Sequence, residues 1–342
     1  MEKTEQKQEE FEAVLGKELI SVALLHLEAK RTAEAISEGS IVKTGFNNLD
    51  TLLMGGVYPG LYVVGAISSL GKTTFVLQLA ETFAKQGKQV LFVSLEMSRL
   101  EIVSKMISRH TFLNADKWNK AKATYKILNG RFEKDFTEEE KDLITRSEEE
   151  LSEINTLYIQ EGVGDIGTSE IRKKAIGIRE TKGEAPIIII DYLQILSPYN
   201  ERLSDKQNVD RNIVELKRLS RDLNTPVIAI SSFNRDSYTD PINLTAFKES
   251  GSIEYSSDVL IGLQYDGMDY KEGEKDGDRQ KRIRELIKDQ DSKYGTPDPR
   301  RVELKVLKNR NGKKGTALFD FYPTFNHFAE AEDPEEDEFI IY

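Results

Sequence analysis

The chain contains the run Leu61-Tyr62-Val63-Val64-Gly65-Ala66-Ile67-Ser68-Ser69-Leu70-Gly71-Lys72-Thr73-Thr74. An apolar stretch, a loop ending in Gly-Lys-Thr and a following helical pattern form the strand–loop–helix context of a phosphate-binding loop, or P-loop. Backbone N–H groups of such a loop, and the N-terminus of its helix, face the phosphates of a nucleotide. One position departs from the motif G-x-x-x-x-G-K-[ST], because its first glycine is Ala66 and Gly65 stands one residue too early. The run predicts a nucleoside triphosphate site between a strand and a helix.

Two residues of this loop have defined roles in the motif. Lys72 is expected to pair with the β- and γ-phosphate oxygens, and Thr73 to hold Mg²⁺. A carboxylate that also holds Mg²⁺ is expected from Asp191, which ends the isoleucine-rich strand 186–191 at the Walker B position. The residues expected to contact the nucleotide are Ala66, Ser68, Ser69, Leu70, Gly71, Lys72, Thr73, Thr74 and Asp191.

Glu96 is the candidate for activating water. It follows the apolar strand 90–94, which we expect to lie next to the P-loop strand. A carboxylate at the carboxyl end of such a strand points into the ligand crevice, where it can orient a water molecule for hydrolysis. The alternative interpretation is an acid at the start of the helix that follows Ser98.

A basic hairpin is predicted near the C-terminus. Apolar and polar residues alternate over 302–306 and 317–321, and Asn311-Gly312 lies between them, the pattern of a β-hairpin. Lys308 and Arg310 stand near its tip. A further cation on the γ-phosphate accelerates phosphoryl transfer by about 10³–10⁵-fold, so this pair could complete the site of a neighbouring subunit. A solvated hairpin or a nucleic-acid contact fits the pair equally well.

Composition limits the class of protein. The 342 residues are 38% hydrophobic and 31% charged, as in a soluble protein of one large or two modest domains. The absence of cysteine excludes disulfides and thiolate metal sites and is typical of the cytoplasm. The apolar runs are too short to span a bilayer, and the polar N-terminus is unlike a signal peptide. Three isolated histidines show no metal-ligand spacing.

The net charge of −11 is unevenly distributed. Residues 138–153 and 330–338 are strongly acidic, and without them the chain is slightly basic, with a cluster of positive charge over 300–314. The overall sign therefore does not exclude an anionic partner. Solvation of a surface helix and of a tail is the preferred interpretation of the two acidic runs.

The rest of the chain alternates between strands and helices. Continuous β-branched runs at 90–94, 186–191 and 227–231, separated by helical patterns, predict a parallel sheet covered on both faces. Residues 98–160 are expected to be mostly helical, and 266–300 to be a mobile insertion. Residues 9–37 are expected to form one long amphipathic helix, packed on its own domain or on a neighbouring subunit.

Several motifs together resemble the C-terminal motor domain of DnaB-type replicative helicases, in the RecA-like ATPase superfamily. They occur in the family's order over about residues 40–328, and the P-loop of this family also commonly begins with alanine. Besides the P-loop they are Thr44-Gly45-Phe46-Asn47-Asn48-Leu49-Asp50, Ser94-Leu95-Glu96-Met97, Ile190-Asp191-Tyr192-Leu193-Gln194, Glu249-Ser250-Gly251-Ser252-Ile253-Glu254 and Lys308-Asn309-Arg310-Asn311-Gly312.

The resemblance implies a role for each matching residue. Glu96 matches the catalytic glutamate, Asp191 the Walker B aspartate, and Lys308 with Arg310 the pair that reaches the adjacent subunit's site. Candidate contacts to single-stranded DNA are the channel loop and residues near it, namely Lys248, Glu249, Ser250, Gly251 and Arg235, with Arg202 and Lys206 in the segment 199–211. That segment has three acids and three bases, so DNA binding is inferred mainly from the resemblance.

A whole-protein function follows from the resemblance as an expectation. It implies a cytoplasmic, ATP- and Mg²⁺-dependent hexameric ring that translocates on single-stranded DNA, with a helicase loader or primase as a possible partner and no membrane. The expected organisation is a linker helix over 1–38, an α/β RecA-like ATPase domain over 39–328 and an acidic tail over 329–342. The N-terminal helical domain of such helicases is not expected before this linker.

One departure from the family weakens the expected motor. The γ-phosphate sensor strand should be followed by glutamine, but the position is Ser232. Loss of one hydrogen bond to a charged oxygen costs roughly 1.5–3 kcal/mol, which corresponds to a rate about ten to a hundred times lower.

Two other functions remain open from the sequence. A RecA-like ATPase that does not unwind DNA, such as a repair accessory protein, loader or regulatory ring, is favoured by Ser232 and by the weakly basic loops. The Glu-Ser-Gly-Ser-Ile-Glu stretch favours the helicase. A P-loop small-molecule kinase is less consistent with the hairpin, because such kinases usually close a lid over their own site.

Overall fold

The computed structural model describes residues 41–331, apart from 68, 163–165, 234–238 and 248–250, together with Ile20, Leu24 and Leu27. The chain divides into two units, Met1–Val42 and Lys43–Tyr342. The three isolated positions in the first unit are helical and exposed. The rest of the predicted helix over 9–37, and the tail from 332 onward, lie outside the described residues. Among the described helices, none is long and apolar enough to cross a membrane.

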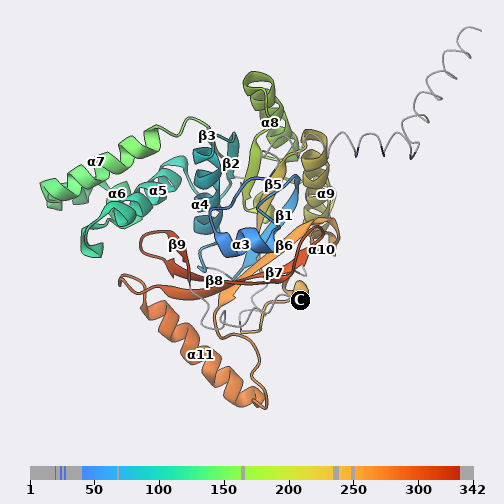
Figure 1. Ribbon diagram of the computed structural model, residues 1–342. Helices are drawn as coiled ribbons and strands as arrows, with labels where there is room; N and C mark the ends of the chain where they lie inside the picture. The colour runs from blue at the N-terminus through green and yellow to red at the C-terminus, as the bar shows by residue number, and fades with distance from the viewer. Residues whose placement is uncertain are drawn as a thin grey trace, which may run out of the picture. The chain divides into compact units, whose positions relative to one another are not determined.

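One sheet organises the second unit (Figure 1). Six strands pair in parallel and three antiparallel strands extend the sheet at one edge. In spatial order the described strands are β3 (Leu157–Glu161), β2 (Val90–Ser94), β4 (Ile187–Asp191), β5 (Pro226–Ser232), β1 (Gly60–Ala66), β6 (Val259–Tyr265), β7 (Arg300–Asn309), β8 (Gly315–Tyr322) and β9 (His327–Glu330). The predicted mostly parallel sheet and its C-terminal hairpin, β7–β8, are confirmed.

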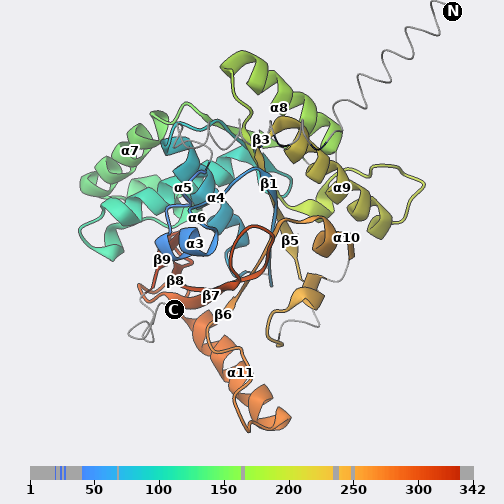
Figure 2. The same ribbon diagram turned by 45° about the vertical axis from the view of Figure 1, so that its right-hand side comes forward.

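Helices cover both faces of the sheet, as its continuous apolar strands require. On one face, α8 (Thr168–Lys182) and α9 (Asp205–Leu223) share a buried apolar cluster with β1, β2, β4 and β5. On the opposite face, α4 (Lys72–Lys85) contacts the same four strands and β3 (Figures 1 and 2). The helix that begins at the P-loop is therefore fixed across the centre of the sheet.

The remaining helices lie toward the margins of the sheet. In both views α5 (Arg99–Asn114), α6 (Thr124–Leu128) and α7 (Glu138–Ser152) lie together on one side, whereas α11 (Asp276–Ser292) projects far from α8 (Figures 1 and 2). Two further short helices are α3 (Asn47–Leu52) and α10 (Gly251–Ser256). Short 3₁₀ turns are η1 (Trp118–Lys120), η2 (Gly130–Asp135), η3 (Leu193–Ile195) and η5 (Leu244–Phe247).

One sequence-based expectation about this unit is wrong, and two others need to be completed. The strand before Glu96 does not neighbour the P-loop strand, because β4 and β5 lie between β2 and β1. Residues 98–160 are mostly helical, as expected, but the segment ends in β3, an edge strand of mostly half-buried residues that pairs with β2 among the described strands. The insertion expected to be mobile contains α11, which buries Ile283 and carries Arg279 over the ring of Tyr270.

A buried charge cluster joins α4 to its neighbours. Glu81 of α4 lies 2.7 Å from Arg109 Nη1, 2.6 Å from His110 Nε2 and 2.7 Å from Lys85 Nζ. The other ring nitrogen of His110 lies 2.7 Å from a carboxylate oxygen of Glu150 in α7. Burial alone would raise the pKa of Glu81, but the hydrogen bond to His110 and the charge of Arg109 outweigh it and lower the pKa to about 2. The P-loop helix is thereby tied to α5, the helix that follows Glu96.

We expect Glu81→Gln to lower the free energy of unfolding by about 3 kcal/mol at neutral pH, the cost of breaking a buried ion pair. The folded-state pKa of about 2 lies below the ordinary value of 4.5. The wild-type carboxylate therefore stabilises the fold fully above pH 4.5 and loses this contribution as the pH falls toward 2. When the free energy of unfolding is measured with urea, the difference between variant and wild type should be smaller at about pH 3 than at neutral pH.

Glu149→Gln, at an exposed position of α7, is the control and should change stability little at either pH. A penalty at Glu81 that stayed the same at both pH values would show that the carboxylate charge does not stabilise the cluster.

Candidate functional site

The predicted P-loop lies between β1 and α4. Gly71, just before α4, has a φ of 86°, in the left-handed region. A Cβ there would also lie 2.7 Å from Phe321 Cζ, so both backbone and space require glycine. Gly65 has another function, because a Cβ at that position would lie 2.3 Å from the ring of Phe233. The glycine one residue early in the motif is therefore a packing position of β1.

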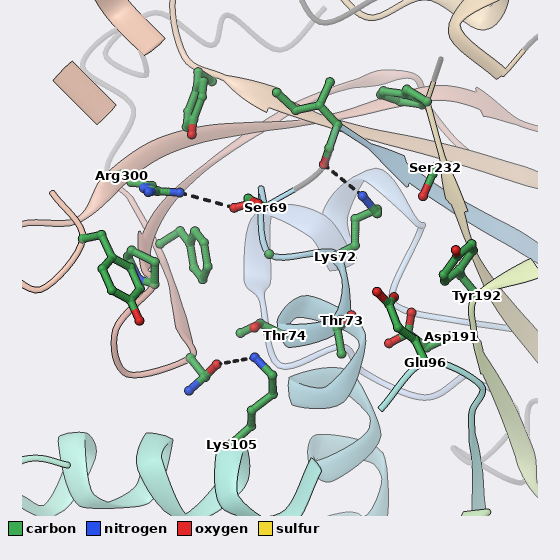
Figure 3. A pocket seen from close by; sticks show the side chains of 18 of the residues that line it. Ser69, Lys72, Thr73, Thr74, Glu96, Lys105, Asp191, Tyr192, Ser232 and Arg300 are labelled. Carbon is green, nitrogen blue, oxygen red and sulfur yellow. Dashed lines mark hydrogen bonds between the residues drawn. The ribbon is translucent and has the colours of Figure 1, made fainter. Parts of the chain in front are cut away.

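A cavity of about 1260 Å³ opens at the carboxyl ends of the parallel strands (Figure 3). The predicted residues Ala66 and Leu70 are buried and do not line it, and Ser68 lies outside the described residues. The predicted residues that do line the cavity are Ser69, Gly71, Lys72, Thr73, Thr74, Glu96 and Asp191. The cavity thus joins the P-loop to residues that follow two other strands.

Lys72 is held against its own loop. Its Nζ donates hydrogen bonds to the carbonyl oxygens of Ala66 and Ile67, at 3.0 and 2.9 Å. Burial lowers the pKa of this lysine to about 8, although the nearby negative charges of Asp191 and Glu96 oppose the shift. A phosphate at the start of α4 would give the ammonium group the strong charge-assisted partner that the two neutral carbonyls do not provide.

Asp191 ends β4 and is 1% exposed. Burial raises the pKa of its carboxyl to about 6, and the charge of Glu96 adds to the increase, whereas a hydrogen bond from the Thr73 hydroxyl opposes it. Its buried Oδ2 has no hydrogen-bond partner among the described residues. In Figure 3, Thr73, Asp191 and Glu96 lie side by side. A buried carboxylate oxygen without a donor, beside a hydroxyl, fits a hard divalent cation such as Mg²⁺.

Glu96 is exposed within the cavity, two residues beyond β2. The turn that carries it is held by Ser94, whose hydroxyl donates to the Met97 carbonyl oxygen at 2.6 Å and accepts from the Met97 N–H at 3.2 Å. The start of α5 is capped by Ser98 and Glu101 in a capping box. Glu96 is therefore not the capping acid of this helix.

Ser232, at the end of β5, is half-buried and lines the cavity near Lys72 (Figure 3). The residue before it, Ser231, accepts a hydrogen bond of 3.0 Å from Gln194 Nε2 through its hydroxyl. This contact joins the segment after Asp191 to the end of β5. The sequence prediction that position 232 faces the nucleotide site agrees with this location.

Several lining residues were missed by the sequence interpretation. Lys105 of α5 donates to Asn326 Oδ1 at 2.8 Å, and burial lowers its pKa. Arg300 donates to the Ser69 carbonyl oxygen at 3.3 Å. The others are Ile67, Met97, Tyr192, Phe233, Tyr265, Ile287, Asp291, Tyr294, Phe321, Pro323 and Asn326. No local motif marks Lys105 or Arg300, because both reach the cavity through long-range packing.

The basic pair of the hairpin lies outside the cavity lining. Lys308 Nζ donates to the carbonyl oxygens of Glu254 and Ser257, and burial lowers its pKa. Arg310 Nη2 donates to the Tyr255 carbonyl oxygen at 2.7 Å. Both cations therefore hold the C-terminal end of α10, where the helix leaves carbonyl oxygens without intrahelical donors.

The candidate DNA contacts can be located only in part. Arg202 lies in the segment before α9, Lys206 in the first turn of α9, and Gly251 at the start of α10, and all three are exposed. α10 packs on α9. The other candidates, Arg235, Lys248, Glu249 and Ser250, lie outside the described residues.

Comparisons with known proteins agree with the geometry. Residues 41–330 match the model of the DnaB-like helicase C terminal domain. The replicative DNA helicase DnaC of Bacillus subtilis (strain 168) is 30% identical over 296 residues, which cover 85% of this chain and 57% of that protein. The replicative DNA helicase DnaB of Geobacillus stearothermophilus is 29% identical, with the same two coverages. The chain thus spans little more than half the length of these relatives.

Solved structures show the same fold. One solved ATPase domain is 25% identical with a TM-score of 0.71, over 92% of this chain and 99% of that one. A DnaB-like replicative helicase, described with its interactions with primase, is also 25% identical, with a TM-score of 0.70 over 92% of this chain and 67% of that one. The chain therefore belongs to the DnaB-like helicase C-terminal domain family, and its sheet is the RecA-like ATPase core of that family.

Proposed function

We propose that this chain is the ATP-hydrolysing motor of a DnaB-type ring helicase that translocates on single-stranded DNA. The observation that carries the proposal is the meeting of Lys72, Thr73, Glu96 and Asp191 at one cavity. These four side chains come from the ends of three different strands. They supply a cation for phosphate, two oxygen ligands for a divalent metal and a carboxylate for water, which is the set that ATP hydrolysis needs.

Nucleotide binding would replace weak internal contacts with strong ones. The phosphates would occupy the start of α4, where backbone N–H groups point outward, and Lys72 would leave its two carbonyl partners for β- and γ-phosphate oxygens. Thr73 and the free Oδ2 of Asp191 would hold Mg²⁺. When bound, the metal neutralises part of the negative charge that develops on the phosphates.

Glu96 would act on the attacking water. The water oxygen forms a bond to the γ-phosphorus as the bond from this phosphorus to the β,γ-bridging oxygen breaks, so that ADP and inorganic phosphate are the products. The carboxylate of Glu96 accepts a proton from that water. Its exposed position in the cavity leaves room for water between it and the start of α4. Lys72 and the loop N–H groups stabilise the charge on the transferred group.

A ring would complete the site. Lys308 and Arg310 do not line the cavity of their own chain, which suits cations that act on a neighbour. We propose a hexamer in which this pair reaches the γ-phosphate held by the adjacent subunit. In the same chain the pair contacts α10, whose first residue, Gly251, belongs to the proposed DNA loop. The short helix α10 would thus connect the basic pair, which senses the neighbour's nucleotide, to the proposed DNA loop.

The partners are part of the same proposal. Single-stranded DNA would run past the loop 248–251 and the exposed Arg202 and Lys206. One structural neighbour is described with its interactions with primase, and we propose a primase or a helicase loader as a protein partner here. We also place the chain in the cytoplasm, in keeping with its lack of cysteine.

We expect Lys72→Ala to abolish ATP hydrolysis, because the phosphates lose their cation. The wild-type chain should hydrolyse ATP faster with single-stranded DNA and should separate a forked duplex. Both activities are measured on the same preparation, with Lys173→Ala, an exposed lysine of α8, as the control that stays active. Stimulation by DNA without strand separation would leave the non-unwinding ATPase as the function. Hydrolysis that survives in Lys72→Ala would remove the site assignment.

Arg310→Ala should lower the ATPase rate by about 10³-fold or more, the contribution of an arginine finger. Mixing it with Lys72→Ala protein should restore part of the activity. In mixed rings, about a quarter of the interfaces join an intact P-loop to an intact hairpin. Lys313→Ala, exposed on the same hairpin, should remain active and serves as the control. No recovery on mixing, with ring formation verified by light scattering, would argue against a finger acting between subunits.

Ser232→Gln should raise the DNA-stimulated ATPase rate by about tenfold, because the amide can restore a hydrogen bond to the γ-phosphate. Ser232→Ala is the matched control; it cannot make this bond and should stay near the wild-type rate. An unchanged rate in the glutamine variant would mean that position 232 does not limit hydrolysis in this chain.

A further inference from the structure

The insertion between β6 and β7 forms one wall of the nucleotide cavity. Ile287 and Asp291, near the C-terminal end of α11, line the cavity, and so does Tyr294 in the turn that follows. The same cavity is lined by Lys72, Thr73 and Asp191, where the phosphates are proposed to lie.

Arg300 fixes this wall relative to the P-loop. Arg300 is 6% exposed, and its guanidinium donates from Nε to the Gln290 carbonyl oxygen at 2.9 Å and from Nη1 to the Ser69 carbonyl oxygen at 3.3 Å (Figure 3). Nη2 lies 3.4 Å from Asp291 Oδ1, and the hydroxyl of Tyr265 donates to the same oxygen at 3.2 Å. One buried side chain therefore joins the end of α11 to the phosphate loop.

The composition of the wall suits a flat, uncharged group. Phosphates at the start of α4 direct the rest of a nucleotide away from Lys72 and Asp191. Arg300, which contacts Asp291 at the end of α11, lies on the other side of Lys72 from Asp191 (Figure 3). Ile287 and Tyr294 line the cavity, with Pro323 from the turn after β8. Tyr294 lines the cavity yet is 58% exposed. Its ring makes no aromatic pair with any described residue.

We propose that the end of α11 and the turn after it form a base subsite, in which Tyr294 and Ile287 hold the face of the nucleotide base. Arg300 is a positioning residue that sets the distance between this subsite and the P-loop. The inference rests on the proposed function, because it assumes that the P-loop binds a nucleoside triphosphate. Stacking reads the face of a base rather than its edge, so the subsite favours purine over pyrimidine nucleotides by contact area.

The test compares two ligands on the full chain by titration calorimetry. ATP carries a base, whereas inorganic tripolyphosphate offers only the phosphates. We expect Tyr294→Ala to raise the Kd for ATP by about tenfold, within the range for one base stacked on an aromatic ring, and to leave tripolyphosphate binding unchanged. Tyr294→Phe keeps the ring and should keep the wild-type affinity. Tyr270→Ala, exposed in the same insertion and outside the cavity lining, is the matched control.

Arg300 is tested by the ratio of the two affinities. Arg300→Lys keeps the charge but cannot donate to both Ser69 and Gln290 in a fixed fork. We expect ATP to lose more affinity than tripolyphosphate, whereas a merely structural role would weaken both ligands alike.

The variants separate a failure of the base subsite from a failure of the phosphate site. Lys72→Ala should weaken both ligands, and its failure to do so would overturn the proposed function. If Lys72→Ala weakens both but Tyr294→Ala weakens neither, or both equally, the phosphate site stands and the base subsite is wrong.

Discussion

Parallel pairing of buried strands is the constraint on which the whole site depends. The register sets Ala66 opposite Ser232 and Ser94 opposite Asp191. Because parallel strands end at the same edge of a sheet, the P-loop, the Walker B carboxylate and the turn bearing Glu96 are brought to one crevice. A one-residue slip would move the apolar side chains of a strand to its other face. Burial of the strands on both sides therefore fixes the chemistry at their ends.

The same burial leaves the site charged and incompletely satisfied. Lys72 donates its described hydrogen bonds to neutral carbonyl oxygens, and the pKa of Asp191 is raised by burial while its Oδ2 has no described partner. Such groups are costly in a low-dielectric setting unless a ligand compensates them. They persist because α4, which carries the P-loop, is fixed by the sheet on one side and by the Glu81 cluster on the other. The proposed phosphate and divalent cation would compensate these two groups.

The sequence identified the P-loop, Glu96 and Asp191, which line one cavity, but not the elements around them, for a physical reason. Strand ends and the P-loop are local features, so Glu96 and Asp191 could be assigned from β-branched runs and the residues that follow them. Strand order depends on how helices cross the sheet, and no local signal placed β4 and β5 between β1 and β2. In the sequence Arg300 is only one charge in a basic run. Its contact with the P-loop could not be predicted, because its partner Ser69 is 231 residues away. The helix α11 was not predicted, because its segment has the high charge and the glycine content that are typical of a loop.

The hairpin contacts show how the proposed ring could couple its two functions. Lys308 and Arg310 donate to carbonyl oxygens at the C-terminal end of α10, which are neutral acceptors, and Arg310 Nη1 lies at the longer distance of 3.8 Å from Asp258 Oδ1. A γ-phosphate in the next subunit is a charged acceptor and forms stronger hydrogen bonds with the same cations. Binding there would therefore draw the pair away from α10, and hydrolysis followed by phosphate release would return it. Since the proposed DNA loop precedes α10, which begins at Gly251, each change of partner at one end of this short helix would act on the proposed DNA contact at the other.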